Sequence, residues 1–248
     1  MFSATERDQL KRQLVERARA DPRIGAAALV GSSAAGTEDA WSDIDLGLEL
    51  ATAVSRDAVM ADWSRAMYDE HRAAHHVDVL SGQAVYRVFL LRRTLQVDIS
   101  FWPSGELVAT SPRYRQLFGA APRAAQPRPP DREHLIGMAW LYALHARSSI
   151  QRGRPWQAEY MLSAARDQVL GLACARVGVP ASDGRGFDSL PPEVLSRLSA
   201  AMPSALNAPS LTQALNALLA GLASEAEAVD LTLAERLKAP LDELRVRI

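Results

Sequence analysis

The stretch LVGSSAAGTEDAWSDIDLGLEL, residues 29–50, places a polar loop between two apolar segments. The first segment belongs to the apolar run IGAAALV, which ends at a glycine and serines and predicts a buried strand. The second, residues 44–50, alternates apolar and polar side chains, which predicts a strand with one buried face. Asp43 and Asp45 open this strand. Side chains two apart on a strand point the same way, so these carboxylates should project together.

Two neighbouring carboxylates repel each other unless cations neutralise them. Mg²⁺ prefers carboxylate oxygens combined with phosphate oxygens over a cage made of protein alone. The aspartate pair therefore predicts a phosphate-bearing ligand. At the end of the first strand, Gly31 allows close backbone approach, and Ser32 offers a hydroxyl and N–H groups to phosphate oxygens.

A third carboxylate, Asp98, lies in the alternating run LQVDISF, on the side opposite the apolar residues. If this strand lies beside residues 44–50, Asp98 completes a triad able to hold two metal ions about 3.5–4 Å apart. Taken singly, the aspartate pair is compatible with a solvated turn, and Asp98 with an exposed strand position. The conjunction of Gly-Ser, Asp-Ile-Asp and a later strand aspartate favours a metal site.

Composition limits the classes of protein. The chain has 248 residues, 48% of them apolar, and a formal net charge of -1. It can therefore fold, and it lacks the positive excess that wrapping nucleic acid requires. A lone cysteine, Cys174, excludes a disulfide framework or a cysteine zinc site. The charged first residues do not suit a signal peptide, and no apolar run suits a membrane span. We expect a cytoplasmic protein without a membrane or nucleic-acid partner.

The change in composition and periodicity along the chain predicts two domains. Residues 1–120 mix helical and strand patterns, residues 121–131 form a linker with four prolines, and residues 132–248 are rich in Ala and Leu at helical spacing. This order predicts an α+β fold, with an N-terminal mixed domain followed by an all-α domain.

The helical half offers further candidates. In the helix predicted after Pro155, Glu159 and Arg166 share a face distinct from the apolar stripe. Arg166 could contact phosphate through the N–H donors of its guanidinium group, and Glu159 could act as general base toward an acceptor hydroxyl. A solvated Glu and Arg on a helix surface is the alternative interpretation. We interpret Trp156 as a packing anchor rather than a stacking platform.

Residues 29–50 resemble the signature of the DNA polymerase β-like nucleotidyltransferases: an apolar residue, Gly-Ser, a short spacer, then Asp-apolar-Asp-apolar. Within that superfamily the stretch is most similar to small bacterial antibiotic nucleotidyltransferases, which adenylylate aminoglycosides or lincosamides. The resemblance implies a short mixed β-sheet flanked by helices in a catalytic domain, residues 1–120. It implies that the helical-bundle domain, residues 132–248, completes the nucleotide and acceptor cleft.

The implied reaction is Mg²⁺-dependent transfer of a nucleoside monophosphate, AMP from ATP, to a hydroxyl of a small molecule, with release of pyrophosphate. An aminoglycoside or lincosamide acceptor would make this an antibiotic-resistance enzyme. The resemblance assigns two Mg²⁺ ions to Asp43, Asp45 and Asp98, and in some relatives the third position also helps deprotonate the acceptor.

The resemblance also assigns the β and γ phosphates of the donor to Gly31 and Ser32, with Ser33 beside them. In one respect the chain departs from the pattern. Many relatives carry a basic residue shortly after Gly-Ser, where this chain has Ser33, Ala34, Ala35 and Gly36. The triphosphate must find its positive partner elsewhere, and Arg166 is the candidate.

Alternatives stay open at this point. The chain could be a regulatory or toxin–antitoxin module of the same fold that modifies a protein or binds nucleotide without turnover. An Asp-x-Asp glycosyltransferase is disfavoured because the motif follows Gly-Ser directly and lies so early in the chain. The acceptor, the preferred nucleotide, the choice of Asp98 or Glu159 as base, and homodimer formation are not decided by the sequence.

Overall fold

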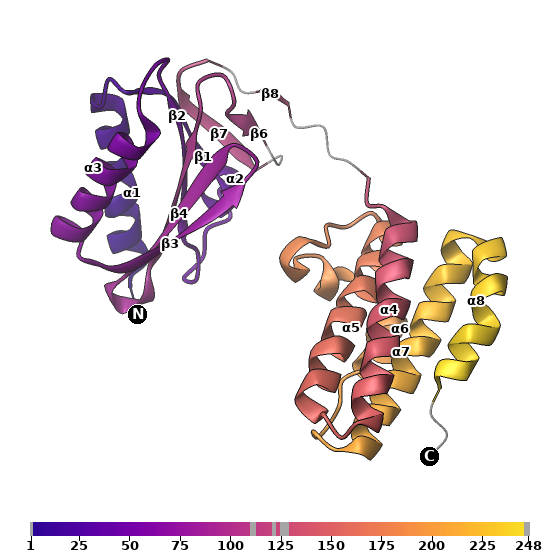
Figure 1. The fold of residues 1–248 in the computed structure, drawn as a ribbon. Helices are drawn as coiled ribbons and strands as arrows, with labels where there is room; N and C mark the ends of the chain where they lie inside the picture. Colours follow the sequence, from indigo (N-terminus) through magenta and orange to yellow (C-terminus); the bar gives the residue numbers. More distant parts are fainter. Residues whose placement is uncertain (1, 110–112, 121–122, 125–128, 246–248) are drawn as a thin grey trace. The chain divides into compact units, whose positions relative to one another are not determined.

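The structure is a computed structural model that describes residues 2–109, 113–120, 123–124 and 129–245. It divides into two compact units, Met1–Pro127 and Arg128–Ile248, which are described separately below (Figure 1). Most of the predicted proline-rich linker, residues 121–131, lies outside the described residues.

A six-stranded mixed sheet forms the first unit, in the order β3-β4-β5-β2-β1-β7. Strands β2 and β5 are parallel, and the other neighbours are antiparallel. Two short strands, β6 and β8, pair separately in parallel. The strands are β1 Ile24–Val30, β2 Ile44–Leu50, β3 Ala73–Ser81, β4 Ala84–Leu91, β5 Gln96–Trp102, β6 Val108–Ala109, β7 Tyr114–Phe118 and β8 Arg123–Ala124.

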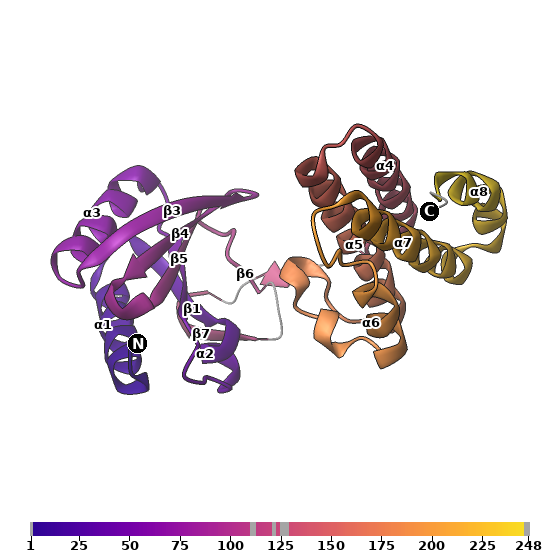
Figure 2. The same ribbon diagram turned by 90° about the horizontal axis from the view of Figure 1, so that it is seen from below.

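Two long helices, α1 (Ala4–Ala20) and α3 (Arg56–Asp69), cover one face of this sheet (Figures 1 and 2). Helix α1 begins at a capping box, in which the Ser3 side chain accepts from the N–H of Glu6 and the Glu6 carboxylate accepts from the N–H of Ser3. The apolar stripes of both helices pack on the alternating apolar side of the strands. The largest fully buried side chains of this core are Leu14, Trp63, Met67, Ile44, Leu46, Leu48, Phe89, Ile99 and Phe101.

The opposite face of the sheet carries the polar members of β2 and β5. On β2 these are Asp45, Gly47 and Glu49, and Leu107 packs over Gly47 together with Ala26 and Ala28 of β1. The Leu107 N–H donates to Glu49 Oε2 at 3.0 Å, which ties the following loop to that end of the strand.

Five α-helices make up the second unit, and α4, α5 and α7 form its centre (Figure 2). Helix α4 begins at Asp131, whose side chain accepts from the N–H of His134, and α5 ends at Gly178 in the left-handed conformation. A partly buried ion pair, Arg176 with both oxygens of the buried Glu225 at 2.9 and 2.8 Å, links α5 to α7. The helices are α4 Arg132–Gln151, α5 Pro155–Val177, α6 Pro192–Ser199, α7 Ala208–Val229 and α8 Leu231–Leu244.

The α+β fold class is confirmed, with a mixed sheet flanked by helices followed by a helical second half. Two details were not predicted. Residues Gly31–Ala35 form a short helix, α2, directly after β1. A further strand, β7, pairs with β1, although its sequence YRQLF lacks the apolar richness of the others. Among the described residues, no helix is long and apolar enough to cross a membrane.

Candidate functional site

Asp45 and Asp98 lie side by side on the parallel strands β2 and β5. Their Cα atoms are direct register partners, so both side chains leave the same face of the sheet. That face is the one opposite α1 and α3. The condition under which Asp98 joins the aspartate pair, that its strand lies beside residues 44–50, is therefore met in the structure.

Asp43 precedes β2 by one residue and lies close to the same group. Gln96 Nε2, two residues before Asp98 on β5, donates to Asp43 Oδ2 at 3.3 Å. Burial raises the pKa of Asp98 to about 6, and the negative charge of Asp43 contributes to the rise. The two carboxylates thus interact electrostatically, and the arrangement favours any ligand that supplies positive charge.

One carboxylate oxygen of Asp98 indicates a site for a cation. Its Oδ1 atom is buried and has no hydrogen-bond partner among the described residues. A buried carboxylate oxygen is costly unless it is paired, and a cation would satisfy it. The donor set of aspartate oxygens suits Mg²⁺, a hard cation.

The aspartates alone do not enclose a metal. Over residues 2–109, 113–120 and 129–245, no three acidic, histidine or cysteine side chains meet the spacing of a metal cluster. This agrees with the habit of Mg²⁺, which takes one or two carboxylates and completes its shell with phosphate oxygens and water. The residues present therefore fit Mg²⁺ bound together with a phosphate ligand.

Gly31 lies directly against Asp45. It has φ +65°, a left-handed conformation, and a Cβ atom at this position would overlap Asp45 Oδ2. The Gly-Ser turn and the aspartate pair are thus in contact, and glycine is required for that contact. The Gly31 N–H donates to the Arg113 carbonyl at 3.1 Å, so it holds β7 rather than a ligand.

Ser32 and Ser33 follow in α2, and their environments differ. The Ser33 hydroxyl is buried and donates to Glu38 Oε1 at 2.6 Å, so this hydroxyl makes a hydrogen bond within the protein. Ser32 is partly exposed. The first N–H groups of a helix have no partner within it, so Ser32 and Ser33 can still offer N–H groups to phosphate oxygens.

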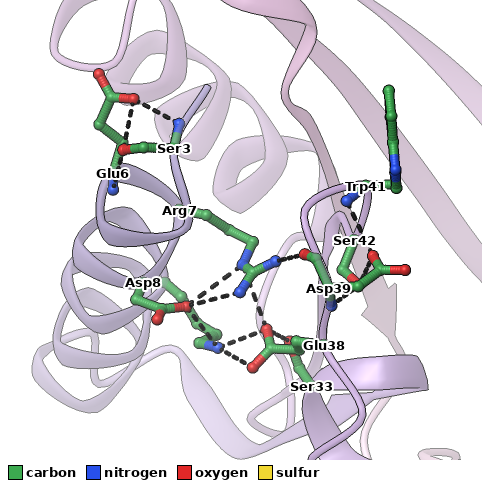
Figure 3. Close-up of polar contacts among 10 residues, drawn as sticks. Ser3, Glu6, Arg7, Asp8, Ser33, Glu38, Asp39, Trp41 and Ser42 are labelled. Carbon is green, nitrogen blue, oxygen red and sulfur yellow. Dashed lines mark hydrogen bonds and ion pairs between the residues drawn. The ribbon is translucent and has the colours of Figure 1, made fainter. Parts of the chain in front are cut away.

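The loop between α2 and β2 is tied down by acidic side chains (Figure 3). The Asp39 carboxylate accepts from the N–H of Trp41 and from the Ser42 hydroxyl, both at 2.9 Å. Burial opposes ionisation of Glu38, yet hydrogen bonds from Lys11 and Ser33 lower its pKa. The two acids that precede Asp43 therefore hold the loop, and Glu38 has protein cations as partners.

Sequence reasoning missed two neighbours of the carboxylates. Gln96 contacts Asp43, and Tyr86 of β4 lies near enough to Asp98 that burial and the Asp98 charge raise its pKa. Alternation along LQVDISF already put Gln96 on the Asp98 side, so that signal was available. Tyr86 required the β4–β5 register, in which it pairs with Ser100.

The face that carries Asp98 continues as an apolar surface over β4 and β3. Val88 is the register partner of Asp98 on one side and of Val77 on the other, so all three share a face. Val77, Val79 and Leu90 are at least half exposed within the first unit. The carboxylates thus lie at the border of an apolar strip.

Glu159 and Arg166 belong to α5 in the second unit. Arg166 donates to the Ala201 carbonyl at 3.2 Å and to the Ser163 hydroxyl at 3.0 Å, contacts that join α5 to the segment after α6. Glu159 is partly exposed. Trp156 is exposed, so it anchors no core in the helical unit and that prediction was wrong.

A short mixed sheet flanked by helices, followed by a helical unit, is the arrangement that the resemblance to nucleotidyltransferases implied. No protein-family model matches the sequence. No curated protein matches it either.

Solved structures do match. One is an aminoglycoside 6-adenyltransferase from Bacillus subtilis, at 11% identity and a TM-score of 0.43, over 98% of this chain and 99% of that one. Two are structures of the Cid1 poly(U) polymerase. The H336N mutant bound to MgATP matches at 16% identity and a TM-score of 0.30, over 40% of this chain and 33% of its own. The other, with Mg 3'-dATP, matches at 12% identity and a TM-score of 0.31, over 71% of this chain and 43% of its own. With scores this low, the roles of individual residues rest on the geometry above.

Proposed function

We propose that this chain is a Mg²⁺-dependent nucleotidyltransferase that moves a nucleoside monophosphate, AMP from ATP, onto a hydroxyl of a small molecule and releases pyrophosphate. The observation that carries the proposal is the register of Asp45 with Asp98 on parallel strands, with Gly31 in contact with Asp45. Asp43 lies near enough to influence the pKa of Asp98. The sequence resemblance supplies the reaction class.

In this proposal Asp43, Asp45 and Asp98 would hold the cations, which would also give the buried Oδ1 of Asp98 a partner. When bound, Mg²⁺ would supply positive charge to the transferred phosphoryl group. Ser32 and Ser33 offer their N–H groups to the donor phosphates. The chain thereby supplies mainly positioning and electrostatic stabilisation, which dominate phosphoryl-transfer catalysis.

The acceptor hydroxyl attacks the α-phosphorus, the bond to the pyrophosphate oxygen breaks, and the hydroxyl proton must leave. Asp98 is our candidate to receive it, because its carboxylate lies beside Asp45 at the proposed metal site and a carboxylate can accept a proton from a nearby hydroxyl. Glu159 of α5 is the alternative base. Glu159→Gln separates them: if Glu159 is the base, this variant should flatten the acid limb of the pH–rate profile, and if Asp98 is the base, the limb should be unchanged.

The experiment is a pyrophosphate-release screen of the full chain with ATP, GTP, CTP and UTP against aminoglycosides, lincosamides and other polyols. We expect release that requires Mg²⁺ and one acceptor class, and that Asp45→Asn abolishes. Asp69→Asn is the matched control, because it neutralises an exposed aspartate at the end of α3. Release that Asp45→Asn leaves intact would refute the assignment of the site.

Labelled ATP tests the other acceptors in the same preparation. Label transferred to a protein in lysate would instead support the regulatory or toxin–antitoxin interpretation. Label or chain extension on RNA would overturn the expectation of a small-molecule acceptor.

A further inference from the structure

Glu38 is the meeting point of side chains from two helices (Figure 3). Lys11 Nζ of α1 donates to its two carboxylate oxygens at 2.6 and 2.8 Å. Ser33 Oγ of α2 donates to Oε1 at 2.6 Å, and Arg7 Nε of α1 lies 3.5 Å from the same oxygen. The Glu38 carboxylate therefore joins α1 to α2 across the loop that leads to Asp43.

The cations on α1 are committed to this loop. Arg7 is only 3% exposed, and besides Glu38 its guanidinium donates to the backbone carbonyl of Asp39 and to the Asp8 carboxylate. The Lys11 side chain is 13% exposed. Burying two cations is costly unless they are paired, so Glu38 and the Asp39 carbonyl offset their desolvation together with Asp8, whose carboxylate lies 3.3 Å from both. The loop conformation and the burial of α1 thus depend on each other.

From these contacts we propose that Glu38, held by Arg7 and Lys11, is a positioning residue for the candidate site. Through Ser33 it fixes the turn that begins at Gly31, and through the loop it fixes the start of β2 at Asp43. The two ends of this loop must be held together because the Gly31 turn is in contact with Asp45. The inference rests on the proposed function where it is tested by enzyme kinetics. Its second test, the mobility of the loop, does not depend on that function.

The kinetic test compares Glu38→Gln with Lys11→Met and their double variant in the full chain. Each should raise the KM for MgATP by about tenfold or more, the usual effect of removing groups that orient ligands. Since both act through one carboxylate, the double variant should be no worse than the poorer single variant. Glu70→Gln is the matched control, because it removes the partner that Arg17, also on α1, has at 3.5 Å in an exposed pair. Its KM should equal that of the wild type.

A second measurement does not need turnover. Amide hydrogen exchange of residues 31–43 should be faster in Glu38→Gln than in the wild type or Glu70→Gln, with the core of β5 unchanged. If Glu38→Gln fails to fold, Ser33→Ala removes one hydrogen bond while leaving both cations paired, and should accelerate exchange in the same segment.

Unchanged KM together with unchanged exchange in a folded Glu38→Gln protein would overturn the inference and leave only a stabilising ion pair. A wild-type protein that turns over no nucleotide would refute the proposed function, whereas the exchange result would still decide the positioning role. The two failures are therefore distinguishable.

Discussion

Replacing Gly31 by Ala is the sharpest perturbation that the first unit offers. The residue has φ +65°, which costs a residue with a Cβ about 1–2 kcal/mol. The new Cβ would also overlap Asp45 Oδ2, so the carboxylate must move by on the order of 1 Å to regain van der Waals separation. The first effect acts on stability, and the second acts on the site.

Gly36→Ala is the control for the first effect. Gly36 has φ +69° at the end of α2, and no described atom lies within 4 Å of its ideal Cβ. Both variants should therefore lose about 1–2 kcal/mol of unfolding free energy, a fall in melting temperature of roughly 4 °C per kcal/mol for a unit of this size. Only Gly31→Ala should lose activity beyond that, by about 100-fold, since a displacement near 1 Å can cost that much.

The assays are thermal unfolding with and without MgATP, and pyrophosphate release at a temperature where both variants are folded. We expect MgATP to raise the melting temperature of the wild type and Gly36→Ala but hardly that of Gly31→Ala. Equal stabilisation and equal turnover in the two variants would refute the contact between the Gly-Ser turn and Asp45 as a requirement of the site.

Three other outcomes follow from the structure. Asp98→Asn should abolish transfer, yet raise thermal stability in Mg²⁺-free buffer, because it removes a buried carboxylate with an unpaired oxygen; a fall in stability would contradict this. Hydrogen bonds from Arg23 lower the pKa of Asp21 from 3.8 to about 2, so its stabilisation is complete above pH 4 and is lost as the pH falls toward 2. Asp21→Asn should lower the unfolding free energy at pH 7 by about 2 kcal/mol and flatten acid denaturation between pH 4 and 2. Glu225→Gln should destabilise the helical unit by about 1 kcal/mol, since it weakens a bidentate pair whose arginine is partly exposed to solvent, whereas an unchanged calorimetric transition would show that the pair contributes nothing.

Much of the site was predictable because its parts are local. Alternation along residues 44–50 put Asp43 and Asp45 on one side, and alternation along LQVDISF put Gln96 and Asp98 opposite the apolar residues. The α+β class followed from the change near residue 120, where mixed helix and strand patterns give way to helical spacing alone. Each of these patterns reflects backbone periodicity over a few residues, which a sequence displays directly.

Contacts between distant segments were not predictable in the same way. That β5, rather than β3 or β4, lies parallel to β2 decides whether Asp98 joins Asp45. Strand order depends on how the whole apolar face packs under α1 and α3. The β7 strand lacked a strong pattern because it lies at the edge of the sheet, where few of its side chains are buried.

The sequence by itself determined the chemistry available to this protein: three aspartates in strand patterns, a Gly-Ser turn, and a helical second half. Only the tertiary structure decided that Gly31 touches Asp45, that Asp98 Oδ1 is buried without a hydrogen-bond partner among the described residues, and that Glu38 pairs with Lys11. The physical reason is that burial and charge pairing are set by neighbours brought together from far along the chain, and these neighbours leave no periodic trace in the local sequence.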